Sequence, residues 1–254
     1  MGEVKEEWKD VDTNPSLKDT IRIYSHSGLC NRLRLIADYR HLSLVKKRGM
    51  QVFWPKSKQC NTSFSDLFKP ISNTTFQYLE SPRRPKNTAS RRFLFPHKLE
   101  IYQQNHLIFE PIDPIQQKID EIKDRIGEGY ISCHVRRSDI ETIQRKYKKE
   151  APSNEFFFNF IDRYPNKNVF LATDSKKTQE RFAEMFGERL FFACTPSGEG
   201  SKRWPKRTTS IVEAVVDLFL CIGSYDFIGT TCSSYTDFIK NYRSGKTHRK
   251  LKED

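Results

Sequence analysis

Apolar and polar positions follow each other along the chain in a pattern that predicts strands separated by helices. Short apolar runs at 21–24 and 51–54 flank a helical spacing of apolar positions that begins near Asn31 and ends at Gly49. The chain is therefore predicted to begin with a strand, a helix and a second strand. Residues 56–112 give no long helix, because prolines and paired arginines interrupt the pattern.

The alternation is clearer in the second part of the chain, which follows a linker bracketed by Pro111 and Pro114. The predicted helices are 115–126, 156–161, 176–186 and 211–222, with a last one from Ser233, and the predicted strands are 130–135, 168–173, 190–193 and 225–229. Strands alternating with helices predict an α/β fold with a parallel sheet covered on both faces. The expected domains are 1–112 and 113–254.

The composition is typical of a folded chain with a net positive charge. The 254 residues include 36% apolar and 13% aromatic residues, too many for a disordered chain. Lys and Arg total 44 and Asp and Glu total 32, which gives a net charge of +12. Such an excess suggests an anionic partner, which could be nucleic acid, a membrane surface or a phosphorylated small molecule.

The sequence gives little support for a membrane span or a metal site. The most apolar stretch, 211–223, is too short to span a bilayer and contains Glu213 and Asp217. The charged N-terminal segment is not a secretory signal, so a cytoplasmic protein is expected if the chain is complete, and a trimmed Golgi-luminal domain is the alternative. Six scattered cysteines include no pair with metal-ligand spacing, so no metal site is expected.

Candidate chemistry gathers where the predicted strands end, which is where parallel sheets bind ligands. Gly28 allows a sharp turn before a helix, and Arg136 and Arg137 offer planar forks that match phosphate oxygens. Pairing of the two arginines with Asp139 is the alternative interpretation. Asp174, directly after a strand, could accept from two N–H groups of guanine or could simply cap the next helix.

Hydroxyl groups stand before the last predicted helix. Thr231, Ser233 and Ser234 suit a phosphate at a helix N-terminus, although such a run is also typical of a helix cap. A nucleoside diphosphate would use all of these strand ends together.

These segments, in this order, resemble motifs of the fucosyltransferase superfamily, which includes the α1,2-, α1,6- and protein O-fucosyltransferases. Residues 134–139 (HVRRSD) resemble the first motif of the α1,6 branch, and 170–174 (FLATD) resemble the second. Residues 211–235 are similar to the third motif, and 27–34 (SGLCNRLR) to the N-terminal turn, with Cys30 where a Gly is common.

The resemblance implies a GT-B architecture, with two Rossmann-like domains facing across a cleft and a small N-terminal domain on the acceptor side. It also implies an inverting, metal-independent and cofactor-free transfer of fucose from GDP-fucose to a glycan acceptor. The donor-binding residues that it implies are Gly28, Asn31, Arg32, His134, Arg136, Asp139, Asp174, Thr231, Ser233 and Ser234. The implied catalytic groups are Arg136, Arg137 and, as general base, Glu141; no acid has the family's spacing, so Glu150, Asp38 and His26 remain alternatives.

Other functions stay open at this stage. The same fold could use another nucleotide sugar such as UDP-xylose, or could bind sugar without catalysis. A nucleic-acid-binding protein would explain the basic runs, but no nucleic-acid-binding motif is present. The basic run 242–254 is expected to be a solvated tail.

Overall fold

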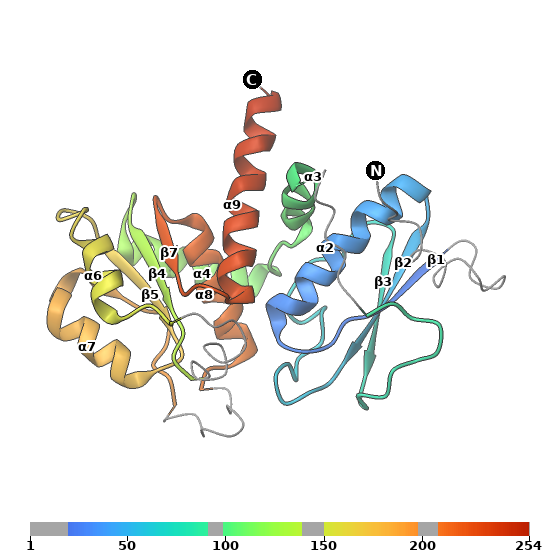
Figure 1. The fold of residues 1–254 in the computed structure, drawn as a ribbon, viewed down its shortest axis with the longest axis horizontal. Coiled ribbons are helices and arrows are strands. Elements are labelled where there is room, and N and C mark those ends of the chain that lie inside the picture. Colours follow the sequence, from blue (N-terminus) through green and yellow to red (C-terminus); the bar gives the residue numbers. More distant parts are fainter. Residues whose placement is uncertain (1–19, 91–98, 139–149, 198–207, 254) are drawn as a thin grey trace. The chain divides into compact units, whose positions relative to one another are not determined.

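The computed structural model describes residues 20–90, 99–138, 150–197 and 208–253 (Figure 1). The chain divides into two compact units, which we call unit 1 (Met1–Ile112 with Asn241–Asp254) and unit 2 (Asp113–Lys240). Each unit has its own sheet, and all paired strands in both sheets are parallel. The predicted α/β class with parallel strands is confirmed.

Unit 1 is built on a sheet of order β1-β2-β3. Its elements are β1 (Thr20–Tyr24), α2 (Leu29–Lys46), β2 (Gly49–Pro55), β3 (Thr74–Leu79), α3 (Leu99–Gln104) and the 3-10 helix η2 (Asn105–Ile108). The third strand was not predicted from the sequence. No side chain of β3 is fully buried, so it lacks the continuous apolar run that marked the other strands.

One face of this sheet forms the core of unit 1. Ile23 and Phe76 lie beside Val52 in neighbouring strands, and Trp54 continues the same face. Phe64, from the segment after β2, stacks on Phe76 with ring centroids 3.6 Å apart, and α2 packs against β1 and β2. Burial of this face favours the observed register, because a slip of one residue in a strand would move its side chains on this face to the opposite one.

Unit 2 contains a sheet of order β6-β5-β4-β7. Its elements are α4 (Asp113–Ile126), β4 (Ile131–Val135), α6 (Asn154–Ile161), β5 (Val169–Thr173), α7 (Lys176–Phe186), η3 (Gly187–Arg189), β6 (Leu190–Phe191), α8 (Ile211–Gly223) and β7 (Phe227–Gly229). The predicted helices and strands of this region are all present, with ends shifted by a few residues.

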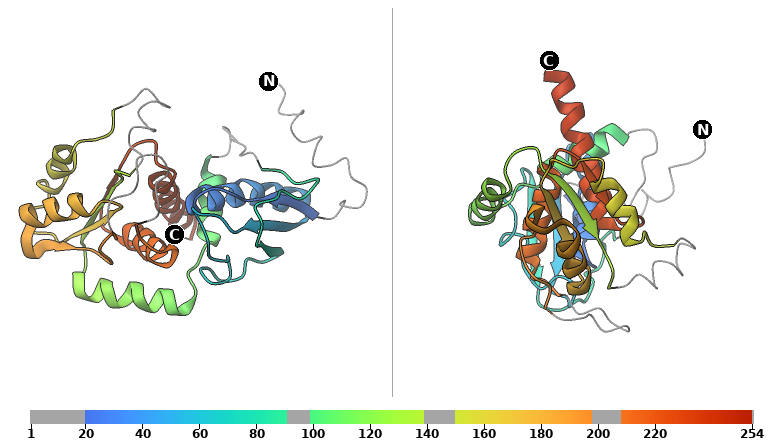
Figure 2. Two further views of the ribbon diagram at one scale, coloured as in Figure 1. Left: turned by 90° about the horizontal axis from the view of Figure 1, so that it is seen from below. Right: turned by 90° about the vertical axis from the view of Figure 1, so that its left-hand side faces the viewer.

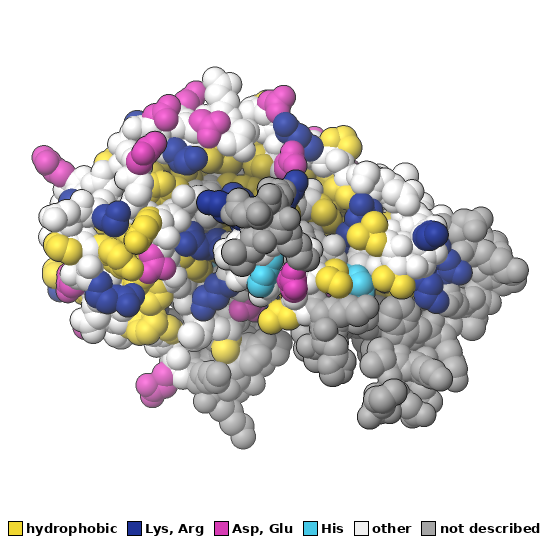
Figure 3. Space-filling view, turned by 90° about the horizontal axis from the view of Figure 1, so that it is seen from above, with side chains coloured by type: hydrophobic (Ala, Val, Ile, Leu, Met, Phe, Trp, Pro, Cys, Tyr) yellow, Lys and Arg dark blue, Asp and Glu magenta, His cyan; other side chains and the backbone are white. Residues whose placement is uncertain are grey.

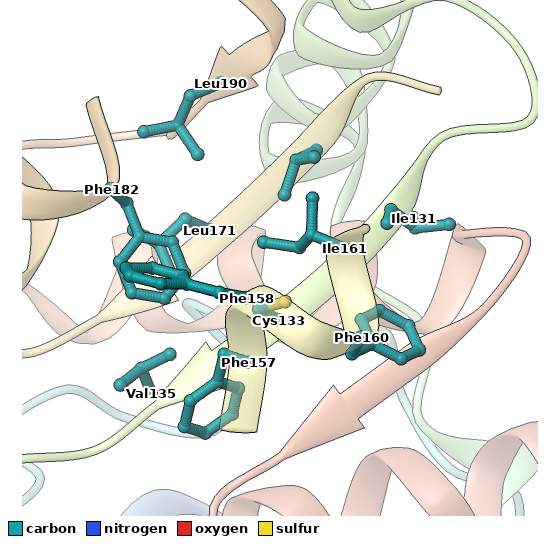
Figure 4. Packing of buried hydrophobic residues seen from close by; sticks show 11 residues of the cluster. Ile131, Cys133, Val135, Phe157, Phe158, Phe160, Ile161, Leu171, Phe182 and Leu190 are labelled. Atoms are coloured by element: carbon teal, nitrogen blue, oxygen red, sulfur yellow. The ribbon is translucent and has the colours of Figure 1, made fainter. Parts of the chain in front are cut away.

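Helices cover both faces of the unit 2 sheet (Figure 2). On one face, alternate residues of β4 and β5 pack against phenylalanines of α6 and α7 (Figure 4). This cluster consists of Ile131, Cys133, Val135, Phe157, Phe158, Phe160, Ile161, Val169, Leu171, Phe182 and Leu190. On the other face, Ser132 Oγ lies 2.7 Å from Ser224 Oγ, just after α8, and α4 packs on α8. The six cysteines are free thiols.

The last helix, α9 (Ser234–Glu253), begins in unit 2 and ends in unit 1. The prediction of a solvated tail from residue 242 onward is therefore wrong. Gly245 lies against α3, since a Cβ at this position would be 2.3 Å from the carbonyl oxygen of Gln103. The side chain of His248 adds a hydrogen-bonding contact of 3.0 Å with Gln103 Oε1. Within the described ranges, no helix has the length and apolar character that a membrane span requires.

Candidate functional site

The carboxyl ends of three adjacent strands of unit 2 bring several predicted residues together. β4 lies between β5 and β7, with Val135 beside Thr173 and His134 beside Gly229. The turns that follow these strands therefore share one edge of the sheet. We call this the unit 2 carboxyl edge; it carries residues 136–138, 174 and 230–234.

Thr230 joins the turns after β4 and β7. Its backbone N–H donates to the carbonyl oxygen of His134 at 2.9 Å, and its hydroxyl oxygen accepts from the backbone N–H of Arg136, also at 2.9 Å. Thr230 is fully buried, whereas Arg136 is partly exposed. The backbone that carries the Arg136 guanidinium is thus held to the neighbouring strand.

Asp174 joins the turn after β4 to the end of β5. Its carboxylate accepts from the backbone N–H of Arg137 at 2.7 Å and from the backbone N–H and hydroxyl of Ser138 at 3.2 and 2.5 Å. The cap of α7 is Ser175, whose hydroxyl accepts from the Thr178 backbone N–H. Asp174 is therefore not the helix cap of the alternative interpretation; it fixes the conformation of the Arg137–Ser138 turn.

The Arg137 guanidinium points to the start of α6. One terminal nitrogen donates to Pro152 O at 2.7 Å and the other to Asn154 Oδ1 at 2.8 Å, and the group lies over the Phe157 ring. Burial lowers the pKa of Arg137, and the nearby Asp174 and Glu155 carboxylates oppose this change. The side chain holds α6 against the β4 turn and stays ionised.

His134 is buried beneath the same edge. Its Nδ1 lies 2.9 Å from Thr236 Oγ1, and its ring stacks on Tyr235 with centroids 4.5 Å apart. Burial and the positive charge of Arg136 lower the pKa of His134 to about 3, against an opposing effect of Asp174. The imidazole is therefore neutral at physiological pH, and it joins β4 to the first turn of α9.

The turn between β7 and α9 presents the start of a long helix at this edge. A Cβ on Gly229 would be 2.5 Å from Thr236 Oγ1, so only glycine lets α9 approach β7 this closely. Ser233 is fully buried, and its hydroxyl has no hydrogen-bond partner within the described residues. Thr231 is exposed and Ser234 is partly exposed.

Three predicted residues belong to unit 1. Gly28 is the N-cap of α2, with open space where a Cβ would be, and Asn31 is exposed in the first turn of the helix. Arg32, in contrast, is fully buried over Trp54, and it donates to Ser27 O at 2.7 Å. Arg32 is therefore a buried group that holds the turn before α2 in place.

Asp139 and Glu141 lie outside the described residues. Of the alternative bases, Glu150 and His26 are exposed, whereas Asp38 is buried in α2. No group of three His, Cys, Asp or Glu side chains within the described ranges has a geometry suited to a metal ion.

Two residues that hold the unit 2 carboxyl edge together, Ser138 and Thr236, were not predicted from the sequence. Ser138 follows the paired arginines directly, so its position was a signal. Thr236 has no sequence signal, because only the approach of α9 to Gly229 brings it to His134.

No family model matches the sequence, and no curated protein matches it significantly. Solved structures do match. NodZ fucosyltransferase from Bradyrhizobium superposes with a TM-score of 0.61 at 15% identity, over 87% of this chain and 92% of that chain. The apo form of POFUT1 gives 0.62 at 8% identity, over 91% and 96% of the two chains.

A FUT1 mutant from Arabidopsis thaliana, in complex with GDP, gives a TM-score of 0.54 at 10% identity, over 89% of this chain and 68% of that chain. These likenesses extend over most of the chain, so they concern the whole fold and not one motif. The resemblance indicated by the sequence motifs is confirmed at the level of the fold: the chain has the fold of the fucosyltransferase superfamily.

Proposed function

We propose that the chain is a glycosyltransferase that transfers fucose from GDP-fucose to a hydroxyl group of a glycan acceptor. The observation that carries this proposal is the unit 2 carboxyl edge, where hydrogen bonds hold three strand ends in one arrangement around Arg136. The start of a 20-residue helix lies at the same edge. A NodZ α1,6-fucosyltransferase crystal soaked with GDP-fucose has the same fold, with a TM-score of 0.61.

The proposed reaction has simple chemistry. The acceptor oxygen forms a bond to C1 of fucose as the bond from C1 to the diphosphate oxygen breaks on the opposite face, which inverts the configuration. The diphosphate leaves with the electron pair, and the hydroxyl proton passes to a base, for which Glu141 is our candidate. Arg136 and the first backbone N–H groups of α9 stabilise the growing negative charge.

Positioning roles follow for the residues around Arg136. Asp174 and Thr230 fix the backbone of the turn after β4, and Arg137 ties that turn to α6. Preorganised groups need no reorientation when charge develops, which is the main source of such stabilisation. We assign Arg137 and Asp174 to this positioning; a contact of Asp174 with guanine would have to share an oxygen that the turn already uses.

The finer architecture is part of the same proposal. Unit 2 would be the donor-binding domain of a GT-B enzyme and unit 1 the acceptor-side domain, with the boundary after residue 112. Gly28 and Asn31 would approach the donor, and Ser233 and Ser234 would contact phosphate. The charge-stabilising role given to Arg136 assumes transfer without a metal ion.

A donor screen with one matched pair of variants tests the proposal. In thermal shift, GDP and GDP-fucose should raise the melting temperature and UDP and UDP-xylose should not. Arg136→Ala should lower transfer or donor hydrolysis, read by mass spectrometry, by about 100- to 1,000-fold, as loss of a transition-state donor does. The control Arg125→Ala removes an exposed cation from α4 and should leave the rate unchanged.

Three outcomes would contradict the proposal. Substantial activity in Arg136→Ala would remove the role of this guanidinium. A shift with UDP-xylose alone would transfer the assignment to another donor, and steeply salt-dependent DNA binding without any nucleotide-sugar binding would favour a nucleic-acid-binding protein.

A further inference from the structure

The positive charge of the chain belongs almost entirely to one unit. Unit 1 has 24 Lys and Arg against 13 Asp and Glu, a net charge of +11, whereas unit 2 has 20 against 19, a net charge of +1. In the face shown in Figure 3, acidic (magenta) and basic (dark blue) side chains are mixed over the part with β4–β7. The proposed donor site is in unit 2, so a diphosphate ligand does not account for the excess.

Five exposed cations of unit 1 lie where its parallel strands end. This unit 1 carboxyl edge comprises residues 25–28, 56–60 and 80–88, which follow β1, β2 and β3. Its exposed cations are Lys56, Lys58, Arg83, Arg84 and Lys86. The one acidic residue in these turns is Glu80, and its Oε2 lies 3.0 Å from Lys56 Nζ.

Three of these cations have no side-chain partner among the described residues. Lys58, Arg83 and Lys86 make no ion pair or side-chain hydrogen bond there. Arg84 is engaged, since it donates to the hydroxyl and the carbonyl oxygen of Thr88. The unit 1 carboxyl edge thus offers three cations without side-chain partners, in addition to Arg84, whose partners are uncharged, and the paired Lys56.

The segment with Arg83 and Lys86 is held at both ends. At its start, the Tyr24 hydroxyl donates to Pro82 O. At its end, Ala89 pairs with β1: its N–H donates to Arg22 O at 2.9 Å, and its carbonyl oxygen accepts from the Tyr24 N–H at 2.7 Å. The cations therefore sit on an ordered segment, which reduces the entropy lost when a ligand binds.

A buried charge adds to the positive potential of the same edge. Arg32 contacts the turns after β1 and β2, through Ser27 O at 2.7 Å and Ser57 Oγ at 3.0 Å. Its pKa is lowered by burial, and no carboxylate opposes this change. Its Nη1 is buried without a hydrogen-bond partner within the described residues. The N-terminus of α2, which has no acidic residue in its first turn, adds its partial positive charge.

We propose that the unit 1 carboxyl edge binds an acceptor oligosaccharide that carries carboxylate or sulfate groups. The inference rests on the proposed function and specifies its acceptor class. Spaced, exposed Lys and Arg side chains without matching acids suit a polymer with repeated negative charges. Single-stranded nucleic acid also needs aromatic side chains on which bases stack. The aromatic residues of this edge are engaged: Trp54 is buried and the Tyr78 hydroxyl donates to Asn61 O.

Direct binding of labelled hexasaccharides to the full chain, without donor, tests this site. The probes are a heparin-derived hexasaccharide, an oligouronate and neutral chitohexaose, with a single-stranded DNA dodecamer as the competing class. The two anionic sugars should bind more tightly than the neutral one, and their binding should weaken as salt rises from about 50 to about 300 mM. The triple variant Lys58→Gln/Arg83→Gln/Lys86→Gln should weaken it about tenfold.

The matched control is Lys46→Gln/Lys47→Gln/Arg48→Gln, which removes three charges from the same unit at the opposite, amino end of β2. It should keep binding within about twofold of the native chain. Equal losses in both triple variants would overturn the proposal, because the effect would then be one of net charge. The proposal would also be overturned if chitohexaose bound as tightly as the anionic sugars and independently of salt. It would be overturned as well if DNA bound more tightly than the anionic sugars through the same three residues.

A transfer assay separates this proposal from the proposed function. The test variant should raise the acceptor KM for an anionic sugar and leave kcat and the GDP-induced thermal shift unchanged. If the chain transferred sugar to neutral acceptors and the triple variant did not change that rate, the anionic-acceptor site would be contradicted. The proposed enzyme function would be unaffected. Anionic sugar binding at these residues without a GDP-induced thermal shift would support the anion-binding site and contradict the proposed function.

Discussion

Each unit contains an arginine shortly after the first strand of its sheet, and the two arginines lie in different electrostatic surroundings. Arg32 in unit 1 lies over Trp54, 4.7 Å from the ring centroid, and Arg137 in unit 2 lies over Phe157 at 5.8 Å. Both donate to a backbone carbonyl oxygen of a nearby turn. The carboxylates of Asp174 and Glu155 act on Arg137, whereas none acts on Arg32.

This contrast extends to the whole units. Unit 2 balances its charges internally, with a net charge of +1, and uses them to fix the turns that carry Arg136. Unit 1 leaves a net charge of +11 unbalanced, and part of that excess is held on an ordered edge. Self-repulsion of this kind destabilises a folded unit, so it is tolerated best where an anionic ligand relieves it.

The largest expected effect concerns α9, which both units share. Gly245→Ala would place a Cβ 2.3 Å from the backbone oxygen of Gln103 in unit 1, and Gly229→Ala would place one 2.5 Å from the Thr236 side chain in unit 2. An alanine inside a helix gains about 1 kcal/mol over glycine. Overpacking against backbone costs about 2–3 kcal/mol, so Gly245→Ala should still lower the free energy of unfolding, measured in urea.

Removal of the neighbouring side chain distinguishes the two contacts. Adding Thr236→Ala should recover part of the loss in Gly229→Ala, whereas no side-chain truncation can relieve a clash with the Gln103 backbone. Gly223→Ala is the control, because its Cβ would meet Tyr130 Oη at an ordinary 3.4 Å. An unchanged stability in Gly245→Ala would show that the end of α9 does not pack in unit 1.

The sequence predicted most of unit 2 and less of unit 1 for a physical reason. The strands of unit 2 are buried by helices on both faces and give continuous apolar runs such as 169–172. In β3 of unit 1, Thr75 and Gln77 are exposed, so the pattern is weak. The end of α9 was missed because its mixed composition resembles a tail, and its helix depends on the tertiary contact at Gly245.

The sequence predicted that the candidate residues of unit 2 share one edge of the sheet, but it did not predict the contacts among them. The rule that ligands bind at strand ends located Arg136, Asp174 and Ser233 on one edge. It could not tell which groups face a ligand and which hold the edge together. Asp174 and Arg137 belong to the second kind because of the hydrogen bonds that each makes across sequence distances of 37 and 15 residues.

The second prediction concerns the acid sensitivity of unit 2. The pKa of His134 is lowered to about 3 in the folded chain, whereas an unfolded chain has a value of about 6.5. As the pH falls, His134 is therefore protonated in the unfolded chain before it is protonated in the folded chain. The stabilisation is complete above about pH 6.5 and is lost as the pH falls toward 3, at up to about 1.4 kcal/mol per pH unit.

His134→Gln should flatten this part of the pH profile, because glutamine can still reach Thr236 Oγ1 and does not titrate. The measurement is the free energy of unfolding in urea at about pH 7, 6 and 5. The control is the same exchange at an exposed position of unit 1, His26→Gln, measured at the same three pH values. A native slope in His134→Gln would place the acid-sensitive group elsewhere and weaken the contrast between the units.

The smallest expected effects test the two arginines directly. Arg137→Met removes a cation that has carboxylates nearby and leaves Pro152 O without its donor, so it should lower stability by about 1 kcal/mol. Arg32→Met removes a buried cation that no carboxylate balances. The substitution also leaves Ser27 O without its donor, but relief from burying an unbalanced charge offsets that loss, so stability should stay within about 0.5 kcal/mol of the native chain.

Binding of the anionic hexasaccharide is a second measurement for Arg32→Met and Arg137→Met. Arg32→Met should weaken binding of the anionic hexasaccharide, since the buried charge contributes to the potential of the unit 1 carboxyl edge, and Arg137→Met should not. If Arg32→Met proved the less stable of the two and bound the sugar normally, Arg32 would be a purely structural group. The positive potential of unit 1 would then depend on its surface cations alone.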